Sequence, residues 1–226
     1  MGSLYGRRDK VEKWARRNGA RVLLAPLRLI EYGSEPGERR GLFDEAAFYV
    51  EKPENLAFTV RNAFLKKKVV EAEPWLGTIL EGSERSNKDL IGLYARMVSE
   101  VRRELSGLYM AKVEHARATA KSMAAQMFFG ARRINPGLEE AAARASALEF
   151  LLSLFEKELG FSSEPSYVSE DVERIYMPIA VVESGGVVIY ELVDKPRKSG
   201  VLNALYSRDP GYRKWIRKNA GLNSYE

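Results

Sequence analysis

The 226-residue sequence contains no cysteine and a single histidine, His115. The absence of cysteine excludes disulfides, iron–sulfur clusters, thiolate zinc sites and a cysteine nucleophile. One histidine also excludes a metal site that needs several imidazoles. His115 follows Glu114 in a helical stretch, and nothing in the sequence identifies the positioned partner that a general base would need. We therefore interpret His115 as an ordinary surface or half-buried residue.

Long apolar runs are also absent. No stretch approaches the roughly 18 consecutive apolar residues of a membrane-spanning helix. Residues 1–20 are basic and polar, and they lack the apolar core of a signal peptide. These features predict a cytoplasmic protein without a membrane partner. High Arg, Lys and Glu content without Cys is typical of thermophile proteins.

Several catalytic motifs are missing. The sequence has no G-x-x-x-x-G-K-[ST] loop and no G-x-G-x-x-G after a predicted strand, so the common nucleotide-binding enzymes are disfavoured. It also lacks the G-x-S-x-G elbow of serine hydrolases. We predict no cofactor, and the protein is more simply explained as a non-enzyme.

A magnesium-dependent nuclease is an alternative, because carboxylates that converge near strands can hold Mg²⁺. Neither Glu51-Lys52 nor Asp194-Lys195 has the one-residue gap of a D/E-x-K signature. This alternative needs three or more carboxylates in one cleft. The candidates near the predicted β regions are Asp44, Glu45, Glu51, Glu183, Glu191 and Asp194.

The composition is that of a globular protein, with 45% hydrophobic and 30% charged residues. The length is compatible with one domain over residues 1–226. A possible division separates a mainly helical core, residues 1–160, from residues 161–226 with a β hairpin and a basic C-terminal helix. The formal charge of +5 is compatible with a polyanionic partner such as nucleic acid.

The first part of the chain predicts short elements of mixed type. A helix over Arg8–Arg17 is expected to end at Asn18-Gly19. Residues 21–33 favour β structure, but Pro26 interrupts them and predicts an edge strand or two short pieces. A second strand is expected over residues 46–50. Pro53 then suits the first turn of a helix over residues 53–68.

The middle of the chain predicts helices. Asn87 is expected to cap a helix over residues 88–105 that ends near Gly107, and another helix follows over residues 108–129. Asn135-Pro136 predicts the start of a third helix, which Gly160 stops. The apolar face of this third helix comprises Leu138, Ala142, Ala145, Leu148, Leu152, Phe155 and Leu159. It could be core, or it could pack against a partner helix in a purely structural assembly protein.

Two β-rich runs, residues 172–183 and 186–193, are joined through Ser184-Gly185-Gly186 and predict a hairpin. Strands at the start, helices in the middle and this hairpin near the end indicate an α+β (mixed α/β) fold. No strand–helix alternation enforces a doubly wound parallel sheet.

Residues 195–218 hold eight basic residues and one acid, with aromatic residues between them. Such a segment could contact a nucleic-acid backbone and stack a base. The alternative is solvated charge, with the aromatic residues anchoring a terminal helix. The candidate binding residues here are Arg213, Lys214, Trp215, Arg217 and Lys218.

Arg132 and Arg133 come just before the helix that starts at Pro136. Free amides in the first turn of a helix attract anions, and two arginines beside them would reinforce a contact with a phosphate or a terminal ribose. The alternative is again solvated charge.

The stretch Ala120–Phe129, followed by Ala131–Ile134, resembles one known family. This family is the kinase-binding subunit of the KEOPS complex, whose members carry an Ala-Lys-Ser helix and a small-residue turn with Arg and Ile. Gln126 stands where the family usually has an acid. A second placement of the motif, on residues 75–85, competes with the first and follows a similar earlier helix over residues 54–68.

The resemblance implies an α/β fold and no catalysis by this chain. It implies binding to the small atypical kinase of the complex and to the 3′ end of tRNA, in support of N6-threonylcarbamoyladenosine formation by the partner subunits. Lys121, Arg132 and Arg133 are then expected near the tRNA tail or the kinase. A non-catalytic accessory subunit of this kind is the leading hypothesis.

Overall fold

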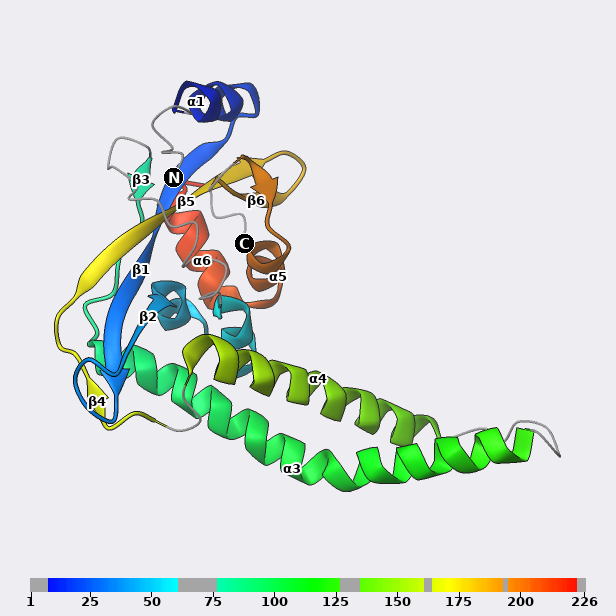
Figure 1. The fold of residues 1–226 in the computed structure, drawn as a ribbon. Helices are drawn as coiled ribbons and strands as arrows, with labels where there is room; N and C mark the ends of the chain where they lie inside the picture. The colour runs from blue at the N-terminus through cyan, green and yellow to red at the C-terminus, as the bar shows by residue number, and fades with distance from the viewer. Residues whose placement is uncertain (1–7, 61–76, 127–134, 161–163, 193–194, 223–226) are drawn as a thin grey trace. The chain divides into compact units, whose positions relative to one another are not determined.

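The computed structural model describes residues 8–60, 77–126, 135–160, 164–192 and 195–222 (Figure 1). The fold is α+β, as predicted. The chain forms two compact units: a sheet unit, residues 1–94 with 164–226, and a helical unit, residues 95–163. The predicted division between residues 160 and 161 is wrong, because the C-terminal hairpin belongs to the same sheet as the N-terminal strands.

Among the described residues the sheet has seven strands, and its main path runs β2-β1-β5-β6-β7. All the pairings are antiparallel except that between β1 and β3. The strands are β1 (Arg21–Gly33), β2 (Arg39–Asp44), β3 (Thr78–Ile79), β4 (Tyr167–Val168), β5 (Glu173–Glu183), β6 (Val187–Glu191) and β7 (Arg197–Lys198). The predicted hairpin is confirmed as β5 and β6, with Gly185 in the left-handed region at φ 64°.

Strand β1 is continuous and central, so the prediction of an edge strand or two pieces is wrong. The amide of Leu80 donates to the carbonyl of Leu24 at 3.0 Å, and alternate residues of a strand face the same edge. The nitrogen of Pro26 therefore points to that edge, between the residues that pair with β3 and those that pair with β2, which begin at Leu27. Pro26 breaks no ladder hydrogen bond there.

The strand predicted over residues 46–50 is also wrong, because residues Glu45–Tyr49 form the 3₁₀ helix η2. The side chain of Asp44 accepts a hydrogen bond from the amide of Ala46 at 2.8 Å, which turns the chain at the end of β2. A second 3₁₀ helix, η3 (Pro53–Thr59), begins at the predicted proline. The rest of the predicted helix, residues 61–68, lies outside the described residues.

Helices cover the sheet within the sheet unit. Helices α5 (Gly200–Arg208) and α6 (Pro210–Asn219) pack against one face, as Figure 1 shows, and bring Leu205 and Ile216 into the main core. Helix α1 (Arg8–Arg17) has the predicted bounds. Its buried Val11 packs with Ala180 and Leu192 in a separate small cluster.

Helix α3 (Asn87–Gln126) is a single helix of 40 residues, so Gly107 does not end it. Its cap is Ser86 and not Asn87. The Ser86 Oγ accepts from the amide of Asp89 at 3.1 Å, and Asp89 Oδ2 accepts from the amide of Ser86 at 3.0 Å, which forms a capping box. Asn87 instead donates to the carbonyls of Ser169 and Asp171.

Helix α4 (Pro136–Leu159) begins and ends as predicted. Asn135 caps it, and Gly160 ends it in the left-handed region at φ 67°. No member of the predicted apolar face is fully exposed: four are buried, namely Ala142, Ala145, Phe155 and Leu159, and three are half-buried, namely Leu138, Leu148 and Leu152. This face therefore does not offer the long exposed stripe that the assembly alternative requires.

Candidate functional site

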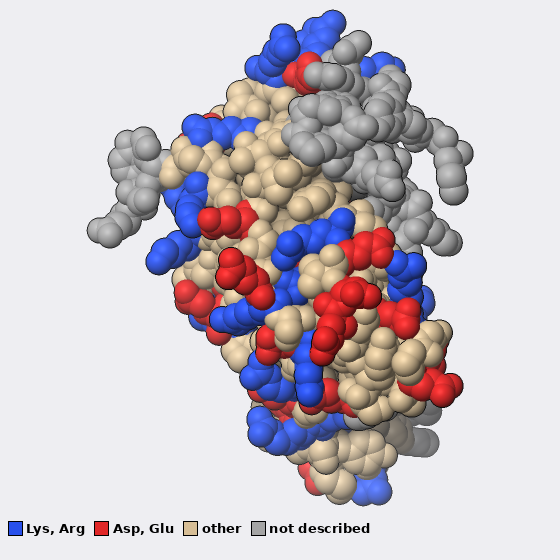
Figure 2. All heavy atoms as spheres, turned by 90° about the vertical axis from the view of Figure 1, so that its left-hand side faces the viewer, with Lys and Arg blue, Asp and Glu red and all other residues tan. Residues whose placement is uncertain are grey.

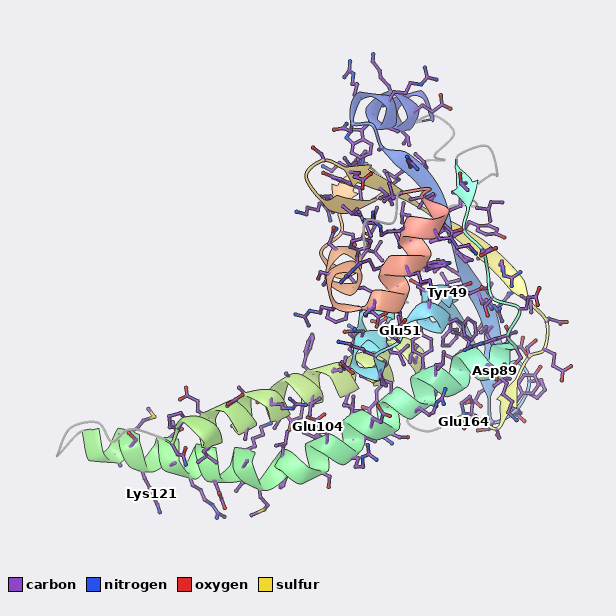
Figure 3. The ribbon with its side chains drawn as sticks, turned by 180° about the vertical axis from the view of Figure 1, so that it is seen from behind. Tyr49, Glu51, Asp89, Glu104, Lys121 and Glu164 are labelled. Atoms are coloured by element: carbon purple, nitrogen blue, oxygen red, sulfur yellow. The ribbon has the colours of Figure 1, made fainter. Side chains whose placement is uncertain are left out.

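The predicted site at the end of the helical unit is only partly described. Arg132 and Arg133 lie outside the described residues. Lys121 is exposed on α3, and Figure 3 shows its side chain pointing away from α4. Residues 120–126 are the described part of the stretch that carries the family resemblance, and they place the exposed Lys121 on α3.

The first turn of α4 does not offer the predicted free amides. Pro136 has no N–H, and the amide of Gly137 donates to Asn135 Oδ1 at 3.0 Å. The amides of Leu138 and Glu139 donate to the backbone carbonyl of Asn135 at 3.0 and 3.1 Å. Asn135 therefore satisfies the donors that an anion would use, and any role of the arginine pair depends on their own side chains.

Trp215 is a core residue, which corrects the predicted base-stacking role. Its side chain is 4% exposed, and its ring stacks on that of Tyr49 with 4.5 Å between centroids and 8° between planes. The alternative, an aromatic residue that anchors the terminal helix, describes it correctly. The sequence did not identify Tyr49 as its partner, because the two residues are far apart in the chain.

Two of the four basic residues beside Trp215, Arg213 and Arg217, make structural contacts. Arg213 Nε donates to the carbonyl of Tyr206 at 3.0 Å, and its Nη2 donates to that of Ser207 at 2.7 Å. These contacts satisfy carbonyls in the last turn of α5 and place a cation at the negative end of its dipole. Arg217 Nη1 donates to the Tyr206 hydroxyl at 3.3 Å.

The two lysines of this segment are exposed. Lys218 Nζ lies 2.7 Å from Glu81 Oε2, in a pair whose side chains are 67% and 66% exposed. Lys214 makes no ion pair with any residue that the structure describes. Of the five C-terminal candidates, Lys214 is therefore the cation whose charge is most available to a nucleic acid.

A further basic surface lies on α1, and the sequence analysis did not select it. Lys10, Lys13 and Arg17 are exposed, whereas Val11 and Ala15 on the other side of the helix are buried. In the view of Figure 2, Lys and Arg gather over α1 at the top, while acidic and basic side chains are interspersed lower down. The i, i+3, i+7 spacing of these cations opposite buried residues is the signal that could have identified them.

The carboxylates of the nuclease alternative have other partners. Glu45 is 0% exposed, and its Oε1 accepts from Arg28 Nε at 2.6 Å and from Arg174 Nε at 2.7 Å. Its Oε2 accepts from the amide of Ser83 at 2.7 Å. The hydrogen bond to Glu45 raises the pKa of Arg174 above its ordinary value. Glu45 is thus a buried counter-ion with both oxygens occupied.

The other carboxylates do not join Glu45. Asp44 caps η2, Glu191 Oε1 accepts from the Ser199 hydroxyl at 2.7 Å, and Glu183 faces Arg217. Asp194 lies outside the described residues. Within the described part of the chain, no group of three or more His, Asp or Glu side chains is placed to hold a metal ion.

The network around Glu45 also holds the loop that follows β3. Arg28 is fully buried, and its Nη1 donates to the carbonyl of Arg85 at 2.6 Å. Arg174 Nη2 donates to the carbonyl of Ser83 at 2.8 Å. A side chain at Gly82 would meet Glu45 Oε2 at 3.0 Å, so glycine suits this close approach. The second placement of the family motif, residues 75–85, therefore ends in a loop that Arg28, Glu45 and Arg174 hold through hydrogen bonds.

In the helical unit, α3 and α4 run antiparallel and side by side (Figures 1 and 3). Arg102 pairs with Glu156 at 3.1 Å, and Lys112 pairs with Glu149. The less exposed side of α3 is apolar at Val98 and Val101. Farther along the helix, the residues at the same heptad spacing are polar: Lys112, His115, Thr119 and Ser122.

His115 is half-buried in this series, in agreement with its interpretation as an ordinary residue. Its backbone carbonyl accepts from the Thr119 hydroxyl at 2.9 Å. No contact of its imidazole with a carboxylate is found among the described residues. The polar series weakens the apolar packing between α3 and α4 near the C-terminal end of α3, since seam positions of paired helices are usually apolar.

No known protein-family model, curated protein or solved structure matches this chain. None of the described helices combines the length and apolar character needed to cross a membrane. The site's own chemistry therefore carries the functional argument.

Proposed function

We propose that this chain is a non-catalytic accessory protein that binds tRNA and a partner kinase, in the manner of the kinase-binding subunit of a KEOPS complex. The observation that carries the proposal is the exposed Lys121, whose side chain points away from α4. It lies in the Ala120–Gln126 part of the resemblance and precedes Arg132 and Arg133 in sequence. A cation at this position is free to meet a phosphate.

The exposed cations of α1 support an RNA partner independently. Lys10, Lys13 and Arg17 share one helix face, and exposed cations of this kind neutralise backbone phosphates and release counterions. Binding through such contacts carries little sequence information, which suits a protein that recognises a common tRNA end.

The non-catalytic part of the proposal is supported by the carboxylates. Glu45, a fully buried acid of the sheet unit, is held by two arginines and a backbone amide. A carboxylate in this state is neither a free metal ligand nor a general base. Activity of the complex would then come from the partner subunits.

Two binding measurements test the proposal. The full chain is expected to bind tRNA more tightly than the same tRNA without its 3′ CCA tail, and to co-purify with the kinase subunit after co-expression. Replacing Lys121, Arg132 and Arg133 together by Ala should weaken tRNA binding roughly a thousandfold, because each cation is expected to contribute about one charge-assisted contact worth about tenfold in affinity. Indifference to the CCA tail together with no association with the kinase would refute the proposal.

The control variant is Lys214→Ala. It removes an exposed cation from a different helix, α6, and should leave discrimination of the CCA tail unchanged. Circular dichroism of both variants separates a lost contact from a lost fold.

A further inference from the structure

The far half of α3 carries a second apolar series, distinct from the side that faces α4. Its members follow the alternating spacing of four and three that defines the seam of a coiled coil. We call it the α3 stripe, and it comprises Tyr109, Val113, Ala116, Ala120 and Met123. At about 1.5 Å per residue the stripe is about 21 Å long, which matches a partner helix of about four turns.

Most of the stripe is exposed in the part of the chain that the structure describes, and Val113 is half-buried. Tyr109 is 57% and Met123 63% exposed, and Ala116 and Ala120 between them are also exposed. At 100° per residue, the stripe lies about 100° around the helix from the polar series of Lys112, which faces α4. Large apolar side chains at regular spacing, with small alanines between them, form a surface on which another helix can pack closely.

The charges beside the stripe select the partner. The ionic side chains that flank it directly are Lys112 on one side and Arg117 on the other, and both are basic. Arg117 makes no ion pair with any described residue, whereas Lys112 is paired with Glu149. Lys121 lies farther out on the side of Arg117, and Glu114 is the single acid between Tyr109 and Met123.

A second copy of the chain fits this surface poorly. Parallel packing of two stripes would bring Arg117 against Lys112 of the other copy. Antiparallel packing centred on Ala116 would bring Arg117 against Arg117. Like charges at flanking positions disfavour pairing in either orientation, whereas glutamates would favour it.

We infer that the α3 stripe is a docking surface for an amphipathic helix of a protein partner, with apolar residues at coiled-coil spacing and acidic residues on its flanks. The inference rests on the proposed function, because it describes the chemistry of the protein partner proposed there. The stripe and Lys121 lie in the same C-terminal half of α3. The inference assigns the stripe to protein binding and leaves Lys121 for RNA.

The test uses the full chain and two synthetic stapled peptides of about 15 residues. Both have Leu and Ala at the seam positions; one has Glu and the other Lys at the flanking positions. Fluorescence anisotropy should show that the Glu peptide binds at least about tenfold more tightly than the Lys peptide. The variant Arg117→Glu should abolish this preference, because it leaves one basic flank at Lys112 and one acidic flank without changing the stripe.

The apolar contact is tested with the double variant Tyr109→Ser/Met123→Ser. It should weaken binding of the Glu peptide about tenfold or more, and the matched control Phe150→Ser, which removes a 71% exposed aromatic side chain from α4, should not. Equal binding of the two peptides, no binding of either, or an unchanged affinity of the double variant would overturn the inference. Self-association that the double variant abolishes, seen by sedimentation, would assign the stripe to a second copy and also overturn it.

Measuring tRNA on the same variants separates the two proposals. The Tyr109→Ser/Met123→Ser variant removes no charge, so its tRNA affinity should be unchanged. A loss of tRNA affinity without any peptide binding would assign the stripe to RNA and overturn the inference alone. Peptide binding with no tRNA binding in any form of the chain would contradict the proposed RNA role and leave the docking surface in place.

Discussion

The ring of Trp215 on α6 lies almost parallel to the ring of Tyr49 on η2, with 4.5 Å between their centroids. The Tyr49 hydroxyl also donates to the carbonyl of Glu81 at 2.9 Å. This stack ties the C-terminal helix to the N-terminal half of the sheet unit. The aromatic residue in the most basic part of the sequence is therefore a structural anchor.

We expect Trp215→Ala to lower the free energy of unfolding by about 3–5 kcal/mol, as for other large buried aromatic side chains. Tyr49→Phe should cost only about 1 kcal/mol, because it keeps the stack and removes one hydrogen bond. Urea denaturation at neutral pH measures both. A Trp215→Ala variant as stable as the parent chain would show that the stack is not formed.

The second prediction concerns acid stability. Asp209 is 0% exposed, and its carboxylate accepts from the amides of Tyr212 at 2.9 Å and Lys52 at 3.0 Å and from Asn55 Nδ2 at 3.1 Å. Burial raises the pKa of Asp209, but these hydrogen bonds together lower it by more than burial raises it, so the pKa lies below its ordinary value. The folded chain therefore binds this proton less readily than the unfolded chain does.

A lowered carboxyl pKa stabilises the fold above the pKa of the unfolded group, about 4, and this contribution is lost as the pH falls through the folded value. We expect Asp209→Asn to cost about 1–3 kcal/mol at pH 7. The difference in unfolding free energy between parent and variant should shrink below about pH 4. A difference that stays constant between neutral and acidic pH would contradict the role of the Asp209 charge.

The third prediction compares a buried and an exposed ion pair. Glu45→Gln leaves the buried Arg28 without its counter-ion and should cost about 3–5 kcal/mol. The matched control Glu81→Gln breaks the exposed pair with Lys218 and should cost less than about 1 kcal/mol. Similar costs in denaturant unfolding for both variants would show that the Arg28–Glu45 network is not buried in solution.

The fourth prediction tests the continuity of α3. Gly107 is exposed inside the helix, and a Cβ added there would meet no atom within 4 Å. Gly107→Ala should therefore raise helicity and stabilise the chain by about 0.5–1 kcal/mol. Thermal unfolding followed by circular dichroism measures this gain. A destabilised variant would indicate that the helix breaks at Gly107, as the sequence suggested.

The elements that the sequence predicted well depend on local chemistry. The bounds of α4 follow from Asn135 and Gly160, whose cap and left-handed turn involve only neighbouring residues. The hairpin between β5 and β6 follows in the same way from Ser184-Gly185-Gly186. Such signals are readable because the partners are a few residues apart.

The elements that it predicted wrongly depend on distant partners. Pro26 is tolerated in a central strand only because its nitrogen faces the gap between β3 and β2, which the local sequence cannot show. Asn87 was the expected cap of α3, but the distant carbonyls of Ser169 and Asp171 accept hydrogen bonds from its side chain, and Ser86 caps the helix instead.

The candidate site was predictable only in part. Lys121 was identified through a local resemblance and lies exposed, as its proposed role requires. The α3 stripe is hard to recognise from the sequence because alanines dominate its centre, and its separation from the α4-facing side depends on how the two helices pair. Trp215 was misassigned because a basic neighbourhood suggests a binding surface even where the ring is buried.

The most direct test of the proposed function is a salt titration of tRNA binding by Lys121→Ala beside Lys214→Ala. Lys121→Ala should weaken affinity for intact tRNA about tenfold and make the negative slope of log affinity against log salt shallower by about 0.7, as for one lost phosphate contact on a single strand. Lys214→Ala should leave the ratio of the affinities for tRNA with and without the CCA tail unchanged, whereas Lys121→Ala should lower it. Equal affinities and equal slopes for Lys121→Ala and the parent chain would show that Lys121 does not contact the tRNA.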